Sequence, residues 1–552
     1  MDLAIKLLGY CWLCVLAVAL VISAVSTDRK ARQVEEYAYD SDPFCYLSIA
    51  QEIRQAAAAR SFPKFTIEHP HTRMLVDHLR AKPWPIKWWY EMISPLAYHY
   101  FPISNQVGVK CPPGTGLLLA AFPEGRALHG LDRLVLGLFV ATGILVLILA
   151  AIKKAWLSGG FVLLALQLGF EILLRIENAS FSVNAMFAPM LLSGLCLTAA
   201  LILRTRGLKS RWPVWALQFG GGLCFGFAIL VRIPIALLTP GLVILLWPGS
   251  LRRWYKSTLL AFFLGVFVGA LPLLVFQSQL TGAWFVPTYG AEDNSPPTIA
   301  AIRQNLSFYF GEGKPSEYNW ALWTMVAGCA GLGAYLGLRR RRAGLLRWWR
   351  VIGGALLMWG LPMFYFLTHE ITGHYYPLPS LFGTVLLLAL SAFVIEGFDS
   401  SKPEQISGGR RILAIACFLL ALLPGAALIE RTWFNYRPPT DEVMPRSFVL
   451  PSELADEKAW VWADIVTGPL WYYARKPAHK INFSGPDGRI ALYQFVLGRG
   501  EPQYIIEDGI DMLRVKDEMV EFGAALERRG EVDGYPYFLI HWPATGPSKE
   551  PH

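Results

Sequence analysis

The sequence predicts an α-helical polytopic membrane protein with a smaller α/β domain at its C-terminal end. Three observations predict this fold class. The chain of 552 residues is 54% hydrophobic and only 16% charged. Apolar runs of about 20 residues, the length of one bilayer crossing, recur between short polar breaks. After residue 431 the sequence turns hydrophilic, so we assign 1–430 to a transmembrane domain and 431–552 to a soluble domain.

About 11 apolar runs are long enough to cross a bilayer as helices. They lie near residues 5–25, 132–151, 157–174, 182–203, 213–231, 233–247, 258–277, 321–338, 351–367, 376–396 and 411–430. The first run has no clear small-residue cleavage site after it, so we expect a retained helix and not a signal peptide. In the C-terminal domain, short apolar runs alternate with helical patterns, which is typical of an α/β fold. That domain has no G-x-G-x-x-G or Walker loop, which argues against nucleotide binding.

Lys and Arg are concentrated in alternate loops, and such loops face the cytoplasm. The clusters are Lys153–Lys154, Arg204–Arg211, Arg252–Lys256, Arg339–Arg350 and Arg410–Arg411. The large first loop (26–131), the 278–320 loop and the C-terminal domain then lie outside the cytoplasm. This requires that the short apolar stretch Gly114–Phe122, which prolines flank, does not cross the bilayer. Because the same clusters carry much of the +9 net charge, we attribute that charge to topology and not to nucleic-acid binding.

The first loop opens on the stretch Tyr39–Arg54, in which Asp40 and Asp42 precede apolar residues at roughly helical spacing. Pro43 suits the first turn of a helix and Asp42 suits its N-cap, so one interpretation is an amphipathic helix on the membrane surface. The second interpretation of this stretch rests on a sequence motif. Asp42, Tyr46 and Ala50 match the D-E-x-x-Y-x-x-x-A pattern that opens the first external loop of many GT-C glycosyltransferases. Pro43 replaces the second acid of that pattern, and Asp40 could substitute for it.

Two later elements resemble the same family. The stretch Lys110–Ala120 is similar to the P-P-G-x-x-x-L-L-A signature that closes the loop, although Pro-Pro-Gly can also be a simple turn. The segment from His374 through Tyr375 and Tyr376 to Pro379 resembles the R-Y-x-x-P-x-x-P element, with a histidine as the basic residue. Relatives often carry a Pro-Asp pair after the third span. This chain has Asn184 near there, and Glu177 could supply the acid instead.

The chain therefore resembles, over most of its length, a bacterial GT-C glycosyltransferase of the protein mannosyltransferase or aminoarabinose transferase type. The resemblance implies inverting transfer of a sugar from a polyprenyl-phosphate donor to a hydroxyl of a glycan, lipid or protein, at the outer face of the cytoplasmic membrane. It implies catalytic carboxylates, with Asp42 as the general base and Asp40 and Glu177 beside it. It also implies a donor-phosphate site of Arg232, His374, Arg175 and Lys110, and a substrate cavity lined by Tyr46, Tyr375 and Tyr376. Expected partners are the donor, the acceptor and membrane lipids, without nucleic acid.

No cofactor is certain from the sequence. Glu68, His69 and His71 could bind a divalent metal, although three such side chains in one polar loop are commonly just solvated. Cys45 and Cys111 are the two cysteines of eight that lie outside the predicted spans, and each adjoins one of the loop motifs. In an oxidising compartment we expect them to form a disulfide, the alternative being a chance arrangement.

Two other functions stay open. Arg175, Glu177 and Arg232 lie at or near predicted spans, and intramembrane charges also mark the path of a secondary transporter. The chain shows no obvious paired halves, which argues against that class. Pro43 and Asn184, the two departures from the family pattern, fit a noncatalytic lipid-binding subunit with a GT-C-like fold. Arg232 itself either faces a polar cavity or extends to the membrane interface.

Overall fold

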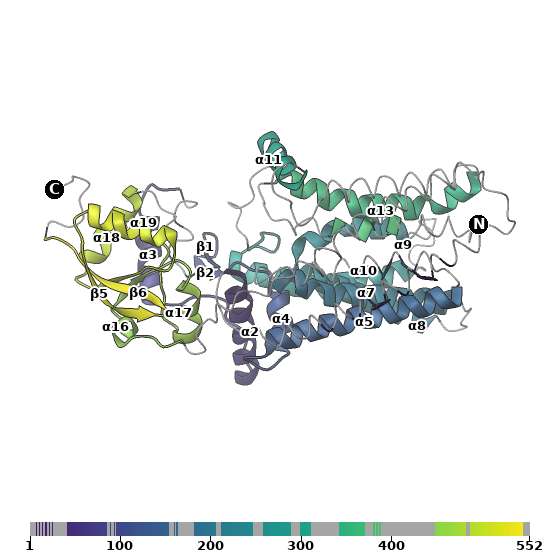
Figure 1. Ribbon diagram of the computed structural model, residues 1–552, viewed down its shortest axis with the longest axis horizontal. Coiled ribbons are helices and arrows are strands. Elements are labelled where there is room, and N and C mark those ends of the chain that lie inside the picture. The colour runs from purple at the N-terminus through teal and green to yellow at the C-terminus, as the bar shows by residue number, and fades with distance from the viewer. Residues whose placement is uncertain are drawn as a thin grey trace.

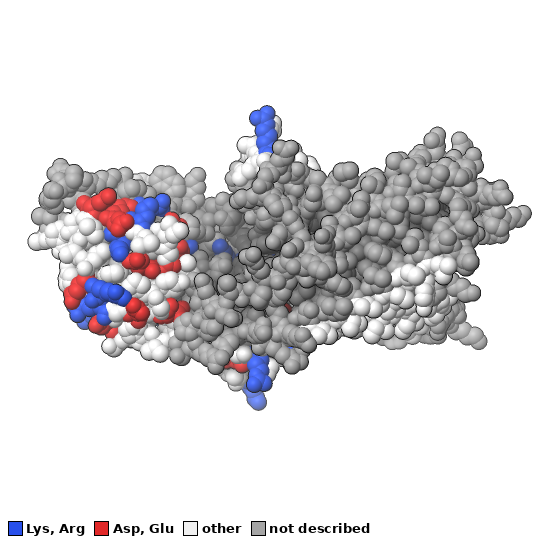
Figure 2. Space-filling view, in the orientation of Figure 1, with Lys and Arg blue, Asp and Glu red and all other residues white. Residues whose placement is uncertain are grey.

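The structure is a computed structural model of the chain. It describes residues 41–85, 97–153, 181–205, 211–246, 258–288, 298–310, 342–369, 448–481 and 486–544, with some isolated positions between these ranges. Figure 1 shows an elongated molecule, with long helices side by side at one end and a sheet with its covering helices at the other. On the face in Figure 2, charged side chains gather over the sheet end, and the described surface of the long helices is largely uncharged.

Five described helices are long and apolar enough to cross a membrane, so the protein is membrane-embedded. They are α5 (Ala127–Lys153), α7 (Phe181–Thr205), α8 (Trp212–Val231), α10 (Thr258–Thr281) and α13 (Arg342–Thr368). They confirm the spans predicted at 132–151, 182–203, 213–231, 258–277 and 351–367. The predicted spans at 5–25, 157–174, 321–338, 376–396 and 411–430 lie wholly or mostly outside the described residues.

At the span predicted at 233–247, the described residues form two short helices and not one continuous helix. Here the chain forms a 3₁₀ helix, η2 (Ile233–Leu238), followed by the short α-helix α9 (Thr239–Leu246). Pro234 and Pro240 each lack a backbone N–H and fix φ, which favours the first turn of a new helix over one continuous helix. Because Gly222 lies against Phe262 and Gly226 against Val266, α8 and α10 run in the same direction, so the chain between them returns along the bundle.

Glycines bring α8 and α10 into close contact. A Cβ at Gly226 would overlap the carbonyl oxygen of Val266, and a Cβ at Gly269 would overlap that of Leu223. In lipid, helices associate through van der Waals packing, and small residues four apart allow their backbones to approach. This packing fixes the position of the end of α8, after which Arg232 follows.

The described residues of the first loop form three helices and a hairpin. These are α2 (Ser41–Ala59), α3 (Pro70–Arg80), the antiparallel strands β1 (Tyr98–Phe101) and β2 (Gln106–Val109), and α4 (Pro113–Ala120). With eight residues, α4 is too short to span a bilayer, as the sequence predicted for Gly114–Phe122. After α10, the described helix α11 (Ile299–Phe310) precedes α13.

The C-terminal region contains a four-stranded mixed sheet with the order β3-β4-β6-β5, in agreement with the predicted α/β fold. Its elements are β3 (Trp460–Trp462), β4 (Gln503–Ile506), β5 (Ala525–Val532), β6 (Tyr535–His541), α16 (Ser452–Ala455), α17 (Thr467–Ala474), α18 (Pro486–Leu497) and α19 (Ile510–Glu521). Strand β3 is parallel to β4, whereas β6 is antiparallel to both β4 and β5.

The two faces of this sheet belong to different cores, because successive strand residues point to opposite faces. Val461 on β3 packs into a small core within the C-terminal region. Trp460 and Trp462 pack into a larger core that also contains Leu75 and Leu79 of α3. In Figure 1, α3 lies with α18 and α19 on one side of the sheet. The first loop therefore completes the C-terminal fold, and we call residues 41–122 and 448–544 together the head.

Candidate functional site

The structure describes part of the expected site. Tyr46, Lys110, Arg232 and both loop cysteines are described with their side chains, whereas Asp42 and Asn184 are described only as backbone in α2 and α7. The other expected site residues lie outside the described residues: Asp40, Arg175, Glu177, His374, Tyr375 and Tyr376.

The described part of helix α2 is Ser41–Ala59, so Asp42 lies inside the helix and is not its N-cap. Every side chain from Pro43 to Ala50 is buried. Tyr46, which we expected in a substrate cavity, is only 1% exposed and lies in the large core. The hypothesis of an amphipathic helix on the membrane surface is therefore wrong for this half of α2. Helices α4 and α17, which are distant in sequence, pack on α2 and cover the faces that would otherwise be exposed.

Helix α4 packs directly on α2. A Cβ at Gly116 would overlap the side chain of Ile49, so glycine is required for this close approach. Arg54 of α2 donates from Nη2 to the carbonyl oxygens of Leu119 (2.9 Å) and Phe122 (3.0 Å), at the C-terminal end of α4. A cation there satisfies free carbonyls and favours the helix dipole. The two motif-bearing helices thus form one unit.

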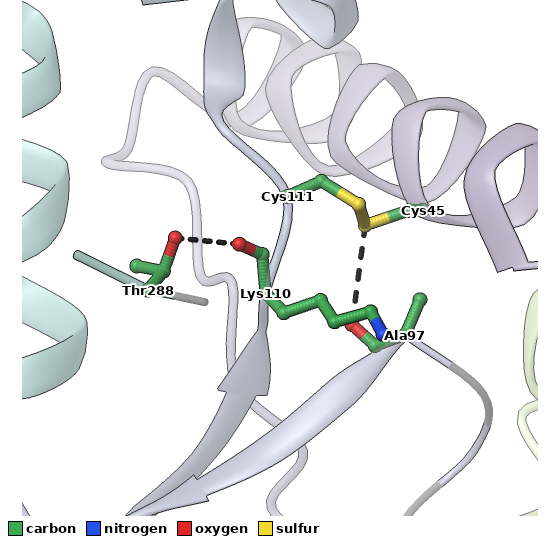
Figure 3. The surroundings of a disulfide bond; sticks show 5 residues. All are labelled: Cys45, Ala97, Lys110, Cys111 and Thr288. Carbon is green, nitrogen blue, oxygen red and sulfur yellow. Dashed lines mark hydrogen bonds between the residues drawn. A yellow bond between two sulfur atoms is a disulfide. The ribbon is translucent and has the colours of Figure 1, made fainter. Parts of the chain in front are cut away.

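A disulfide joins Cys45 of α2 to Cys111, directly before the Pro112–Pro113 turn, and confirms the expected pairing. Figure 3 shows its surroundings. The sulfur of Cys45 lies 3.9 Å from the carbonyl oxygen of Ala97. Next to the bridge, the Lys110 N–H donates to Ala97 O (2.9 Å), and Thr288 Oγ1 donates to Lys110 O (2.5 Å). Because Thr288 follows α10, this bond also connects the loop motif to a membrane helix.

Arg232 lies at the turn between α8 and η2, against the first turn of α4. A Cβ at Gly114 would come within 2.5 Å of the Val231 nitrogen and 2.7 Å of the Leu230 carbonyl oxygen. The side chain of Arg232 is 7% exposed, so protein atoms cover it. This burial argues against an arginine that extends to the membrane interface, and favours one that is paired or faces a polar site.

The C-terminal region adds a residue that sequence reasoning missed. Arg475, at the end of α17, forms an ion pair with Glu52 of α2, with Nη1 3.0 Å from Oε1. It also donates from Nη2 to Gln51 Oε1 at 3.0 Å. Burial raises the pKa of Glu52, and the Arg475 charge opposes that rise. An arginine in a polar region gives no local signal of a partner that lies over 400 residues earlier.

Glu68, His69 and His71 do not converge on a metal site. Glu68 forms an exposed ion pair with Lys64 (3.5 Å), and the His71 ring stacks on Trp460 with 4.2 Å between centroids. Among the residues that the structure describes, no group of three or more His, Cys, Asp or Glu side chains could hold a metal ion. Burial lowers the pKa of His71 to about 4, so this ring is neutral at pH 7.

The first turn of α2, the Pro112–Pro113 turn and Arg232 were predicted from separate stretches of sequence. The structure brings them together at the head end of α8 and α10, through the disulfide, Gly116 and Gly114. An acid-bearing helix start and a buried arginine at one end of a membrane bundle form an arrangement that suits a lipid-linked anion. Comparisons with protein-family models, curated proteins and solved structures gave no match to this chain.

Proposed function

We propose that the protein is a glycosyltransferase that moves a sugar from a polyprenyl-phosphate donor to a hydroxyl acceptor at the membrane surface. The observation that carries the proposal is the meeting of α2, α4 and Arg232 at the head end of the membrane helices. A phosphate leaving group needs positive charge, and Arg232 is a buried cation that lies beside the first turn of α4. The alternating Lys and Arg clusters support a head outside the cytoplasm.

The reaction assigns one task to each group. The Asp42 carboxylate accepts the proton of the acceptor hydroxyl while that oxygen bonds to the sugar's anomeric carbon. The bond from this carbon to the donor phosphate breaks, and the phosphate leaves with the electron pair beside Arg232. Attack from the face opposite the leaving group inverts the anomeric configuration. The N-terminal turn of α2 favours the ionised form of a carboxylate, as a general base requires.

The first prediction is that Asp42→Asn lowers turnover by about 100-fold or more, because general-base assistance typically supplies about 100- to 10,000-fold in rate. The substitution keeps the size of the side chain, so folding and binding of the lipid donor should persist. The measurement is sugar transfer by the purified protein in lipid nanodiscs, from a defined polyprenyl-phosphate sugar. Asp77→Asn is the matched control, since Asp77 is an exposed head residue paired with Arg73 (3.6 Å).

Asp40→Asn tests the register of the motif. Normal turnover in Asp42→Asn with a dead Asp40→Asn would move the base two residues earlier. Full activity in both variants would place the base elsewhere and overturn the role of α2. A wild-type protein that retains polyprenyl phosphate but never transfers sugar would instead be the noncatalytic lipid-binding subunit. Solute uptake by proteoliposomes without sugar transfer would identify a transporter.

A further inference from the structure

Helix α17 of the C-terminal region lies along α2, the helix that carries Asp42. Near the start of α17, a Cβ at Gly468 would come within 2.7 Å of the Phe44 ring. At its end, Arg475 reaches Gln51 and Glu52. The contact points are seven residues apart on α17 and seven to eight apart on α2, about 11 Å at 1.5 Å per residue. The two helices therefore run side by side for about two turns.

The contact at Arg475 is geometrically specific. Two different guanidinium nitrogens contact two different acceptors, Glu52 and Gln51, each at 3.0 Å. The guanidinium also lies over the Trp471 ring, with its carbon 5.6 Å from the ring centroid. The Arg475 N–H donates to Trp471 O (3.0 Å) where α17 ends. Because the planar guanidinium uses two donors at once, it fixes the orientation of Glu52 and Gln51 as well as their distance. A lysine ammonium cannot do this.

We infer that Arg475 is a positioning residue: by holding Glu52 and Gln51 it fixes α2, and with it the backbone of Asp42, relative to Arg232. This inference rests on the proposed function. The disulfide, Gly116 and Arg54 attach α2 to α4 within the first loop. Arg475 attaches the same helix to the other end of the chain. Because a displacement of about 1 Å can cost about 100-fold in rate, the C-terminal region contributes to turnover without touching the substrate.

The second prediction follows from this role. Arg475→Gln should lower kcat by about 10- to 100-fold with little change in the KM for the lipid donor, because chemistry depends on alignment more than binding does. Arg475→Lys should recover part of the loss, since it keeps the charge but not the fork. The charge swap of Arg475→Glu with Glu52→Arg should recover more than either single change. Arg529→Gln is the control, because it removes an exposed ion pair with Glu527 on β5.

A readout that does not depend on activity separates this role from the proposed function. Hydrogen exchange of the full chain in nanodiscs, followed by mass spectrometry, should show faster exchange of the 41–59 peptide in Arg475→Gln and not in Arg529→Gln. A fall in kcat without faster exchange, or faster exchange at full kcat, would overturn the positioning role. If no donor supports turnover in the wild type but Arg475→Gln still speeds exchange, the attachment of α2 stands and the glycosyltransferase proposal falls.

Discussion

Asp508 is a buried carboxyl group that supports the start of α17. Its oxygens accept hydrogen bonds from the backbone N–H groups of Asp464 (3.0 Å) and Val466 (2.7 Å), just before that helix. Burial raises the pKa of Asp508 to about 7, although these donors favour the charged form. The side chain thus binds a proton in the folded head at a pH where a solvated aspartate is ionised.

The third prediction concerns this proton. A carboxyl whose pKa is raised by folding adds stability that is fully present below about pH 4, its unfolded pKa, and is lost as pH rises through about 7. Asp508→Asn cannot ionise, so this loss disappears, and the stability of the head should rise more steeply with pH between 5 and 7 than in the wild type, because the buried histidines His71 and His479 add stability as pH rises. The change in slope is at most about 1.4 kcal/mol per pH unit. Unfolding followed by tryptophan fluorescence measures it.

The control for Asp508 is Asp511→Asn, since Asp511 is an exposed residue on α19 whose side chain lies 3.6 Å from Arg514. It should leave the pH profile of the wild type unchanged. Parallel profiles for Asp508→Asn and the wild type would show that the buried carboxyl does not take up a proton in this range.

At the residue scale, the sequence predicts a contact when the residue type itself indicates its partner, as a cysteine does for a disulfide. Cys45 and Cys111 were paired correctly because few cysteines lie outside the predicted spans. Arg475 could not be found in this way, because its acceptor Gln51 is 424 residues away. The role of Asp42 stays a prediction, since it rests on a motif match and on the backbone position in α2.

At the element scale, α3 shows how one helix joins the two halves of the head. Its rings stack on the C-terminal region, His71 on Trp460 and His78 on Phe495, with 4.2 and 4.1 Å between centroids. Nearby, His479 Nδ1 lies 3.1 Å from the carbonyl oxygen of Ile93. We call these three histidines the seam.

Burial lowers the pKa of each seam histidine, to about 4 for His71 and about 3 for His479. Lys476 and Arg499 lower the pKa of His71 further, whereas Glu501 raises it. Histidines that are neutral when folded but basic when unfolded add stability above pH 6.5, and this stability is lost as pH falls towards 4 and 3. The seam therefore weakens in acid.

The fourth prediction is that α3 exchanges its amide hydrogens faster at pH 4.5 than at pH 7, after correction for intrinsic exchange rates. His71→Phe keeps a ring for stacking on Trp460 but cannot take up a proton, so it should reduce the acid effect. His541→Gln is the control, because His541 is an exposed residue on β6 beside Glu527. Equal acid sensitivity of His71→Phe and the wild type would mean that the ring at position 71 does not cause the opening.

The element prediction for α2 failed because tertiary contacts overrode a local pattern. The spacing of apolar residues predicted a surface helix at α2. Instead, Gly116 allows α4 to pack on it, and Gly468 allows α17 to do the same. Within the apolar run at 233–247, Pro234 and Pro240 separate η2 from α9, a break that the hydropathy of the run does not predict. Long apolar runs without internal breaks, such as α5, were predicted correctly because length and hydropathy decide them.

At the scale of the whole molecule, the head joins residues that the sequence assigns to two domains. Leu75 and Leu79 of α3 are 1% and 0% exposed, and they share one core with Trp460 and Trp462 of β3. This core cannot be predicted from the sequence. The apolar pattern of the region 26–131 does not show that it packs on the region 431–552, and the reverse is also true. The C-terminal region should therefore stay attached to the membrane domain without a covalent link.

The fifth prediction tests that attachment in the full chain. A protease site inserted at residue 440, between the last predicted span and the described sheet, allows the C-terminal fragment to be cut free in membranes. The fragment should remain membrane-bound through a high-salt wash, since an apolar core holds it and salt mainly screens exposed charges. Leu79→Ala removes a fully buried side chain, which typically costs about 2–5 kcal/mol, and should release the fragment after cleavage. Leu513→Ala, at a partly exposed position on α19, should not. Release of the wild-type fragment by cleavage alone would show that the two parts of the head fold around separate cores.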